Sequence, residues 1–178
     1  MSLISELEAQ LTHTAALVAP STVSVGRDHR GAGVVVAPGK VLTNAHNLRD
    51  RTVQITFDDG RVEQAKVVGA DPGHDLVVLD VDTGDAPALE WADRAPGLGA
   101  FVVAAARDGA GVRVTLGTVS QPSRSFRGPG GRPIALALEH TAPLARGSSG
   151  GPLTDLEGRL VAVNTHRLGK GFTAAQVA

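Results

Sequence analysis

The sequence predicts an all-β protein made of two six-stranded antiparallel β-barrels, with a short helix before them. Three observations support this fold class. The 178 residues include 22 glycines and 10 prolines, which is typical of short strands joined by tight turns. Short apolar runs recur about every ten residues, a spacing that favours an antiparallel barrel or sandwich over alternating strands and helices. A strand-poor stretch, Thr83–Gly99, separates two equal sets of such runs, and two equal sets fit two small barrels.

The N-terminal segment predicts one amphipathic helix. Leu3, Leu7 and Leu11 recur at helical spacing after Ser2. Pro20 marks the end of this helix, because the residue before a proline disfavours helical geometry.

The expected organisation is a helix over residues 1–19, a first barrel over 20–90 and a second barrel over 91–178, the two barrels acting as one domain. The segment Gln121–Pro133 is predicted to be a flexible loop from its composition. The strands expected in the first barrel are Thr22–Val25, Gly33–Ala37, Lys40–Thr43, Thr52–Phe57, Arg61–Val68 and Leu76–Val81. Those expected in the second barrel are Ala100–Ala105, Gly111–Val119, Ile134–Glu139, Gly151–Thr154, Leu160–Asn164 and Gly171–Thr173.

Composition excludes several classes of protein and site. A net charge of −1 and 3% aromatic residues argue against nucleic-acid binding, because basic surfaces and base-stacking side chains are both scarce. The chain has no cysteine, so it forms no disulfide and no cysteine-ligated metal site. Its six histidines lack the spacing of metal ligands, and we expect neither a metal nor a cofactor.

The sequence leaves the cellular compartment unassigned. No apolar run reaches the about 20 residues that a membrane-spanning helix needs, so the chain as written is expected to be soluble. Glu6 and Glu8 interrupt the region where a secretory signal would be apolar. An extracytoplasmic location stays open if an upstream signal or anchor has been removed. The oligomeric state is not predicted.

The strongest local signal for chemistry is the run Gly147-Ser148-Ser149-Gly150-Gly151. Glycines beside a serine let the backbone approach a substrate and let successive N–H groups converge on one point. Acyl transfer needs both features, because the nucleophile must reach the carbonyl carbon and hydrogen-bond donors must already lie where the oxyanion forms. A glycine-rich turn without catalytic function is the alternative interpretation of this run taken alone.

The same run also matches G-x-S-x-G, the nucleophile turn of α/β-hydrolases. That turn lies between a strand and a helix, and an acid and then a histidine follow it in the chain. Pro152 comes too soon after the glycines for a helix to start there. No alternating strand and helix pattern surrounds Asp155 and His166, so we reject this alternative.

Two further residues complete a candidate nucleophile–base–acid set. His46 ends the apolar run that begins at Val41, and Asp75 begins the apolar run that continues to Val81. Both are polar residues at the ends of predicted strands, where a rigid scaffold commonly presents catalytic side chains. A serine nucleophile needs such a base and a group that orients it.

Three motifs in this order resemble the trypsin/chymotrypsin-like serine proteases, and most of all their bacterial HtrA (Deg) branch. The motifs are Thr43-Asn44-Ala45-His46, Asp75-Leu76-Val77-Val78-Leu79 and Gly147-Ser148-Ser149-Gly150-Gly151-Pro152. The resemblance covers nearly the whole chain, from about Ala15 to Thr173. It implies two six-stranded barrels packed face to face, with the active site in the cleft between them.

The resemblance also implies the role of each residue at the site. Ser149 would attack the scissile carbonyl, His46 would take its proton and pass it to the leaving amine, and Asp75 would fix the imidazole tautomer. The N–H groups of Gly147 and Ser149, with Ser148 between them, would form the oxyanion hole. The implied activity is that of a serine endopeptidase acting on a polypeptide.

The substrate-binding residues follow from the same resemblance. Pro143 and Leu144 would form one wall of the primary specificity pocket. Asn164, Thr165 and His166 would pair with the substrate backbone as an added strand, and Thr165 would also support the triad aspartate. No acidic residue lies at the expected base of the pocket, which disfavours cleavage after Arg or Lys. We expect a small or medium apolar residue there, while basic residues near the other wall leave an acidic preference open.

Several features depart from the family pattern. Ser148 stands where digestive relatives carry the aspartate that pairs with a newly cut N-terminus, so that route of activation is expected to be absent. The segment Gly26–Arg30 is shorter than the HtrA loop that supports trimers, and the chain length leaves no room for a PDZ domain. The alternative to a peptidase is a latent or inactive protease-fold module that binds unfolded or extended peptides. A weaker alternative is esterase or transferase chemistry on a small acyl substrate.

Overall fold

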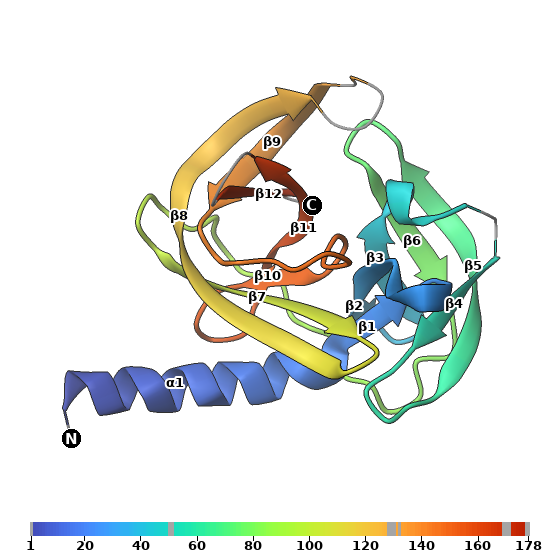
Figure 1. Cartoon of the computed structure of the whole chain (residues 1–178), viewed down its shortest axis with the longest axis horizontal. Helices are drawn as coiled ribbons and strands as arrows, with labels where there is room; N and C mark the ends of the chain where they lie inside the picture. The colour runs from blue at the N-terminus through green and yellow to red at the C-terminus, as the bar shows by residue number, and fades with distance from the viewer. Residues whose placement is uncertain (1, 50–51, 128–130, 132, 169–171, 177–178) are drawn as a thin grey trace.

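The computed structural model describes residues 2–49, 52–127, 131, 133–168 and 172–176. It contains two closed six-stranded antiparallel barrels with a helix before them (Figure 1). The predicted fold class is confirmed.

The first barrel closes because β1 pairs with β2 on one side and with β4 on the other. Its hydrogen-bonded order is β1-β2-β3-β6-β5-β4. The interior is aliphatic around one aromatic ring, with Val25, Ile55, Phe57 and Leu79 all buried. The strands are β1 (Thr22–Val25), β2 (Gly31–Ala37), β3 (Lys40–Asn44), β4 (Thr52–Thr56), β5 (Val62–Asp71) and β6 (Leu76–Asp80).

The second barrel has the order β10-β11-β12-β9-β8-β7. Its interior uses smaller side chains, such as Ala104 and Ala162 beside Val119, Leu138 and Leu153. The strands are β7 (Phe101–Asp108), β8 (Gly111–Arg127), β9 (Pro133–His140), β10 (Pro152–Thr154), β11 (Leu160–Leu168) and β12 (Phe172–Gln176).

One expectation about this barrel is wrong. The segment predicted to be a flexible loop begins as strand, because β8 continues to Arg127 and pairs with β9 as far as Pro133. The pairing shifts register between Gln121 and Arg124. A β-bulge of this kind accommodates Pro122, which has no N–H to give to the ladder. The rest of that segment includes residues 128–130 and 132, which lie outside the described residues.

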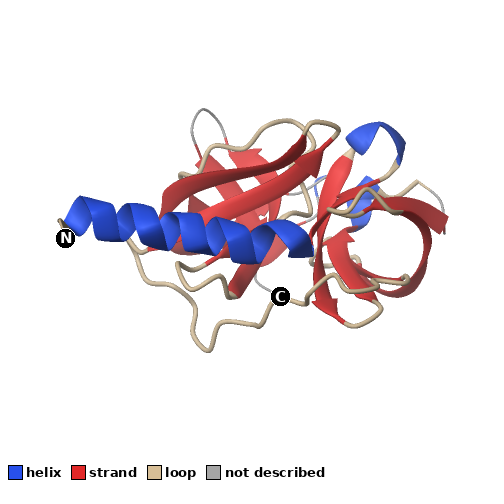
Figure 2. Cartoon of the chain, turned by 90° about the horizontal axis from the view of Figure 1, so that it is seen from below, coloured by secondary structure: helices blue, strands red, loops and turns tan. Residues whose placement is uncertain are grey.

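Helix α1 (Leu3–Val18) lies lengthwise along the outside of the second barrel (Figures 1 and 2). Ser2 caps it by accepting a hydrogen bond from the Ser5 N–H. The Gln10 amide and the buried Thr14 hydroxyl both donate to the Leu156 carbonyl in the second barrel. In the part of the chain that the structure describes, no helix is both long and apolar enough to cross a membrane.

The link between the barrels has no strand in the described structure, as predicted, apart from an isolated bridge between Trp91 and Leu160. The link is hydrogen-bonded to both barrels: Leu89 N–H donates to Val35, and Glu90 accepts from Leu160. One buried cluster joins the helix, the link and both barrels, which fixes the barrels against each other. Its members are Val18, Val34, Leu42, Leu76, Leu89, Ala105, Leu160 and Val163. The residue boundaries assigned to the two barrels stay a prediction.

Candidate active site

Ser149 lies on the glycine-rich turn that leads into β10. Gly147 and Gly150 have φ values of 86° and 90°, a region that favours glycine. A Cβ atom at Gly150 would lie 2.1 Å from the Ala32 carbonyl oxygen and 2.3 Å from Thr43 Oγ1. Only glycine fits this position, because the turn presses directly against the first barrel.

His46 and Asp75 lie at neighbouring strand ends in the first barrel. His46 is in the short 3-10 turn η3 (Ala45–Asn47) after β3, and Asp75 directly precedes β6. The pairing of Asn44 with Leu76 brings these two ends together. Asp75 has a φ of 58°, which an aspartate tolerates better than most residues. This strained conformation is held by two hydrogen bonds, from Ala45 N–H to its carbonyl and from His46 N–H to its Oδ1.

The three predicted side chains form one hydrogen-bonded chain. Ser149 Oγ lies 2.7 Å from His46 Nε2, and His46 Nδ1 lies 2.5 Å from Asp75 Oδ2. Asp75 is only 8% exposed, so its carboxylate is shielded from water. A carboxylate at Nδ1 favours the tautomer with the proton on that nitrogen. Nε2 is then a hydrogen-bond acceptor that faces the serine hydroxyl.

The structure adds Asn44, to which the sequence assigned no role although it lies inside a quoted motif. Asn44 is fully buried, and its Nδ2 donates to the Asp75 carbonyl at 3.2 Å. This bond turns Oδ1 towards Ser149, whose Oγ is 2.8 Å away. The Thr165 carbonyl is a further acceptor at 3.1 Å. Three acceptors, His46 Nε2, Asn44 Oδ1 and the Thr165 carbonyl, thus surround the single proton of the Ser149 hydroxyl.

The main chain of Ser149 is fixed by the first barrel. Its carbonyl accepts hydrogen bonds from the Ala32 N–H and from Asn47 Nδ2, both at 2.8 Å. Asn47 is buried and also donates to Thr43 Oγ1 at 3.1 Å. Ser149 of the second barrel is thus positioned by donors of the first barrel.

The N–H groups of the turn are paired unequally. Ser148, which is buried, donates through its N–H to the Ala145 carbonyl at 3.3 Å. Gly150 N–H donates to the Asn164 carbonyl at 2.7 Å. Among the described residues, no acceptor contacts the N–H of Gly147 or of Ser149. These are the two donors that the family resemblance predicts for an oxyanion hole.

The expected substrate-binding residues lie on β11 and on the segment between β9 and β10. The Asn164 N–H and C=O are both bonded to the glycine-rich turn, so any substrate pairing along β11 would use the residues after Asn164. The Thr165 hydroxyl lies 3.4 Å from Asp75 Oδ2. His166 continues β11, but its side chain is outside the described part of the structure. Pro143 is exposed, while Leu144 packs against the core of the second barrel.

His140 has a partner that the sequence did not reveal. It is fully buried, and its Nε2 lies 2.9 Å from Asn164 Oδ1. Its Nδ1 accepts from the Ala142 N–H, so Nε2 carries the proton and donates to Asn164 Oδ1. Burial lowers the pKa of His140 to about 4. His140 is therefore a neutral support behind Asn164 and the glycine-rich turn.

Residues 31–163, well over half of the chain, match the family model of the trypsin-like peptidase domain. The chain belongs to this family. The predicted resemblance to trypsin-like serine proteases is therefore confirmed.

Curated relatives place this trypsin-like domain near the DegP proteases, which confirms the HtrA (Deg) branch. A probable periplasmic serine endoprotease DegP-like from Bartonella henselae is 36% identical over 164 residues, or 82% of this chain and 31% of that protein. The periplasmic serine endoprotease DegP of Escherichia coli K12 is 35% identical over 141 residues, or 76% of this chain and 29% of that protein. The chain thus spans about three tenths of the length of these relatives.

Solved structures agree with the assignment. The active form of the Rv3671c protease from M. tuberculosis matches with a TM-score of 0.82 and 26% identity, over 96% of this chain and 82% of that chain. The inactive form of the Rv3671c protease matches with a TM-score of 0.80 and 27% identity, over 96% of this chain and 90% of that chain. The trypsin-like domain described here therefore has a fold shared by both states of that protein.

Proposed function

We propose that this trypsin-like domain is a serine endopeptidase in which His46, Asp75 and Ser149 act as a catalytic triad. The observation that carries the proposal is the unbroken hydrogen-bonded chain from Ser149 Oγ through the imidazole of His46 to Asp75 Oδ2, with distances of 2.7 and 2.5 Å. Such a chain gives a serine hydroxyl an adjacent base that a third group orients.

The first half of the reaction forms an acyl-enzyme. Ser149 Oγ attacks the peptide carbonyl while its proton moves to His46 Nε2, and Asp75 stabilises the resulting imidazolium. The negative carbonyl oxygen is stabilised by the N–H groups of Gly147 and Ser149. His46 then gives the proton to the leaving amine as the C–N bond breaks. In the second half, water attacks the ester carbonyl while His46 Nε2 takes a proton from it. His46 then gives that proton to Ser149 Oγ as the bond between Oγ and the acyl group breaks and the carboxylic acid leaves.

Two features of the site support an enzyme that is competent without rearrangement. The Ser149 carbonyl is fixed by Ala32 and Asn47, and this leaves little freedom to the turn. The donors proposed for the oxyanion hole have no acceptor among the described residues, so a substrate oxygen displaces nothing from them.

The names of the relatives suggest the substrate class and the place of action. The DegP relatives are periplasmic serine endoproteases by name. We extend both properties to this chain as proposals, with polypeptides as substrates and an extracytoplasmic site of action. The specificity pocket walled by Pro143 and Leu144, and substrate pairing along β11 beyond Asn164, belong to the same proposal.

Covalent labelling tests the proposal. A fluorophosphonate probe reacts with an activated serine hydroxyl. We expect stoichiometric labelling of the wild-type protein and none of Ser149→Ala, together with a fall of about 10⁶-fold in peptide hydrolysis. Ser123→Ala is the matched control, since Ser123 is an exposed serine on β8 that takes no part in the hydrogen-bonded chain of the proposed triad.

The possible outcomes separate the proposal from its alternatives. Labelling that persists in Ser149→Ala would contradict the assigned nucleophile. A folded wild-type protein that is not labelled but binds extended peptides would instead be a latent module. Rapid hydrolysis of small esters without cleavage of any peptide library member would indicate an esterase.

A further inference from the structure

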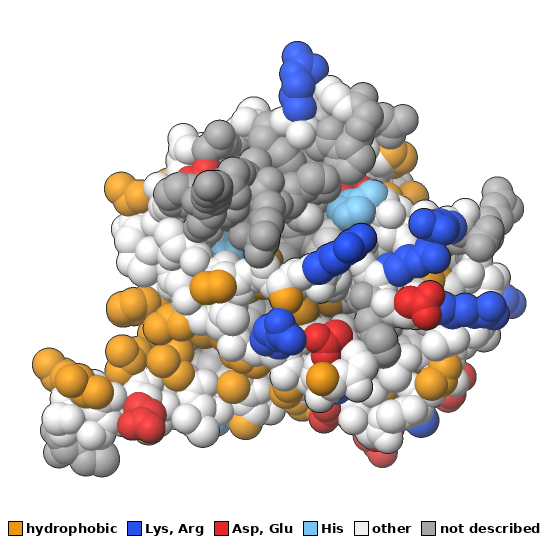
Figure 3. All heavy atoms as spheres, viewed as in Figure 1, with side chains coloured by type: hydrophobic (Ala, Val, Ile, Leu, Met, Phe, Trp, Pro, Cys, Tyr) orange, Lys and Arg blue, Asp and Glu red, His pale blue; other side chains and the backbone are white. Residues whose placement is uncertain are grey.

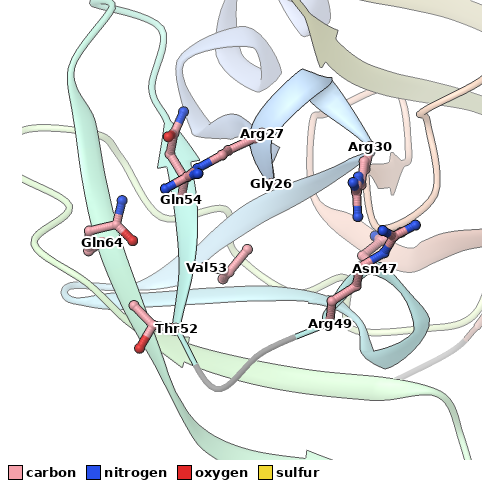
Figure 4. A pocket seen from close by; sticks show the side chains of 9 residues that line it. All are labelled: Gly26, Arg27, Arg30, Asn47, Arg49, Thr52, Val53, Gln54 and Gln64. Carbon is pink, nitrogen blue, oxygen red and sulfur yellow. The ribbon is translucent and has the colours of Figure 1, made fainter.

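A polar pocket of about 370 Å³ lies on the first barrel, and three arginines line it. Arg27 and Arg30 come from the turn after β1, and Arg49 follows η3 (Figure 4). Arg30 and Arg49 extend towards each other beside Asn47 in this view. Gln54 and Gln64, paired across β4 and β5, add amide groups to the opposite wall.

These arginines differ from most others that the structure describes. Arg61, Arg107 and Arg159 each pair with an aspartate. No ion pair or hydrogen bond to a described residue involves Arg27, Arg30 or Arg49. Asp28, on the same turn, does not line the pocket, and Asp50 and Arg51 lie outside the described residues.

The wider surface shows the same excess of positive charge. In the space-filling view, Lys and Arg side chains gather on this face over the first barrel, with an acidic side chain among them (Figure 3). Three unpaired guanidinium groups around one hollow form a site that an anion would complete, because each presents a planar set of donors suited to a carboxylate.

The pocket adjoins the proposed catalytic centre through Asn47. This residue lines the pocket, directly follows His46 in the chain and donates to the Ser149 carbonyl at 2.8 Å. The turn that carries Arg27 and Arg30 packs against it, since a Cβ atom at Gly31 would lie 2.3 Å from Asn47 Nδ2. The pocket wall and the catalytic centre therefore share a side chain.

The proposed mechanism indicates which half of a substrate passes this wall. In the substrate pairing proposed above, we place the half before the scissile bond along β11 of the second barrel. His46 gives a proton to the leaving amine, so the half after the scissile bond passes His46 on the side of the first barrel. Arg49 is three positions beyond His46, and Arg27 and Arg30 line the same pocket from the turn after β1.

We propose that this basic pocket binds the side-chain carboxylates of Asp or Glu residues that follow the scissile bond, so that the enzyme prefers substrates that are acidic on the leaving side. This inference rests on the proposed peptidase function. A polypeptide substrate brings carboxylates as its common anions, and three arginines give them complementary charge. The arginines are exposed, so each contributes modestly and is screened by salt.

Matched peptides test the preference. A cleaved peptide is first found by library profiling and then made with either Glu or Gln at the two positions after the scissile bond. We expect kcat/KM to be about tenfold higher for the Glu peptide at low ionic strength, and the ratio to shrink as salt is added. Glu placed before the scissile bond should give no such gain.

Substitution of the three arginines tests whether the pocket causes this preference. The combined substitutions Arg27→Gln, Arg30→Gln and Arg49→Gln should bring the Glu/Gln ratio to about one while hydrolysis of the Gln peptide changes less than about twofold. Arg94→Gln, an exposed arginine outside the pocket, should keep the ratio. A ratio of one in the wild type, or a full ratio in the triple variant, would overturn the proposal.

A measurement of peptide binding distinguishes an error in the proposed pocket from an error in the proposed peptidase function. The Glu and Gln peptides, carrying a fluorophore, are titrated into Ser149→Ala protein and followed by anisotropy. Tighter binding of the Glu peptide that the three arginine substitutions abolish supports the pocket even if the wild-type protein cleaves nothing. Equal binding of the two peptides contradicts the pocket, whatever the catalytic outcome.

Discussion

The two barrels contribute to the proposed site in different ways. In the first barrel, His46 and Asp75 are brought together by the regular pairing of β3 with β6, so the base and the acid are positioned within one barrel. In the second, Ser149 lies on an irregular turn whose carbonyl is held by Ala32 and Asn47 of the first barrel. The positions of the proposed base and acid are thus determined locally, while the position of the proposed nucleophile depends on contact between the barrels.

Among substitutions that spare both the proposed nucleophile and the proposed base, the largest effect is expected at Asp75. Asp75→Asn should lower kcat by about 10⁴-fold, because an amide at this position favours the wrong imidazole tautomer. Thermal unfolding should show an intact fold. Asp71→Asn removes an exposed carboxylate that pairs with His74, and it should leave kcat nearly unchanged. Equal losses in the two variants would show that Asp75 has no special role.

The contact between the barrels is tested next by Gly150→Ala. The new methyl group would meet the Ala32 carbonyl at 2.1 Å, and the residue would also be strained at a φ of 90°. We expect the free energy of unfolding in urea to fall by about 4 kcal/mol. Gly60→Ala is the control, since Gly60 has a φ of 84° but no atom within 4 Å of its Cβ position. Gly60→Ala should therefore cost only about 1 kcal/mol of backbone strain.

A smaller effect, on the pH dependence of stability, is expected from His140, the buried residue behind Asn164 and the glycine-rich turn. The pKa of His140 is about 4 in the folded protein, below the ordinary value of 6.5. The unfolded chain therefore binds more protons between these values, and stability falls as the pH drops through that window. From pH 7 to pH 5 the loss from this residue should be about 2 kcal/mol.

Urea unfolding of the wild type and of His140→Gln at both pH values isolates this loss. The Gln amide offers an NH₂ donor group and a carbonyl acceptor, and it does not titrate. The pH dependence of His140→Gln should be weaker by about 2 kcal/mol, and identical dependences would rule out His140 as the cause.

The smallest effect is expected at Asn47, which gives the Ser149 carbonyl one of its two donors. Asn47→Ala should lower stability by about 1 kcal/mol and slow fluorophosphonate labelling about tenfold, with the Ala32 bond still in place. A loss of stability without slower labelling would mean that Asn47 supports the fold but does not position the nucleophile.

Local sequence patterns predicted much of the fold because its determinants are local. Turn pairs such as Asp59-Gly60 bound the strands, and the helix ends before Pro20 as expected. The three motifs also named the side chains that the structure brings into hydrogen-bonding distance. The continuation of β8 to Arg127 was missed because a bulge, rather than a loop, accommodates Pro122.

Other parts of the site depend on contacts between distant segments. Asn47 and Ser149 are 102 positions apart, and no periodicity of either segment indicates that they touch. The same holds for Asn44 with Ser149 and for His140 with Asn164. The three arginines of the basic pocket come from two separate turns, so only the closed barrel reveals that they line one hollow.

The central claim is that the two barrels supply parts of one catalytic unit, and a double-mutant cycle tests it most directly. His46→Ala, Ser149→Ala and the double variant are compared with the wild type by kcat on one peptide. Residues that act as a unit are strongly non-additive, so the double variant should lose about as much activity as either single variant, about 10⁶-fold. Losses that multiply in the double variant, or a single variant that keeps most of its activity, would contradict the claim.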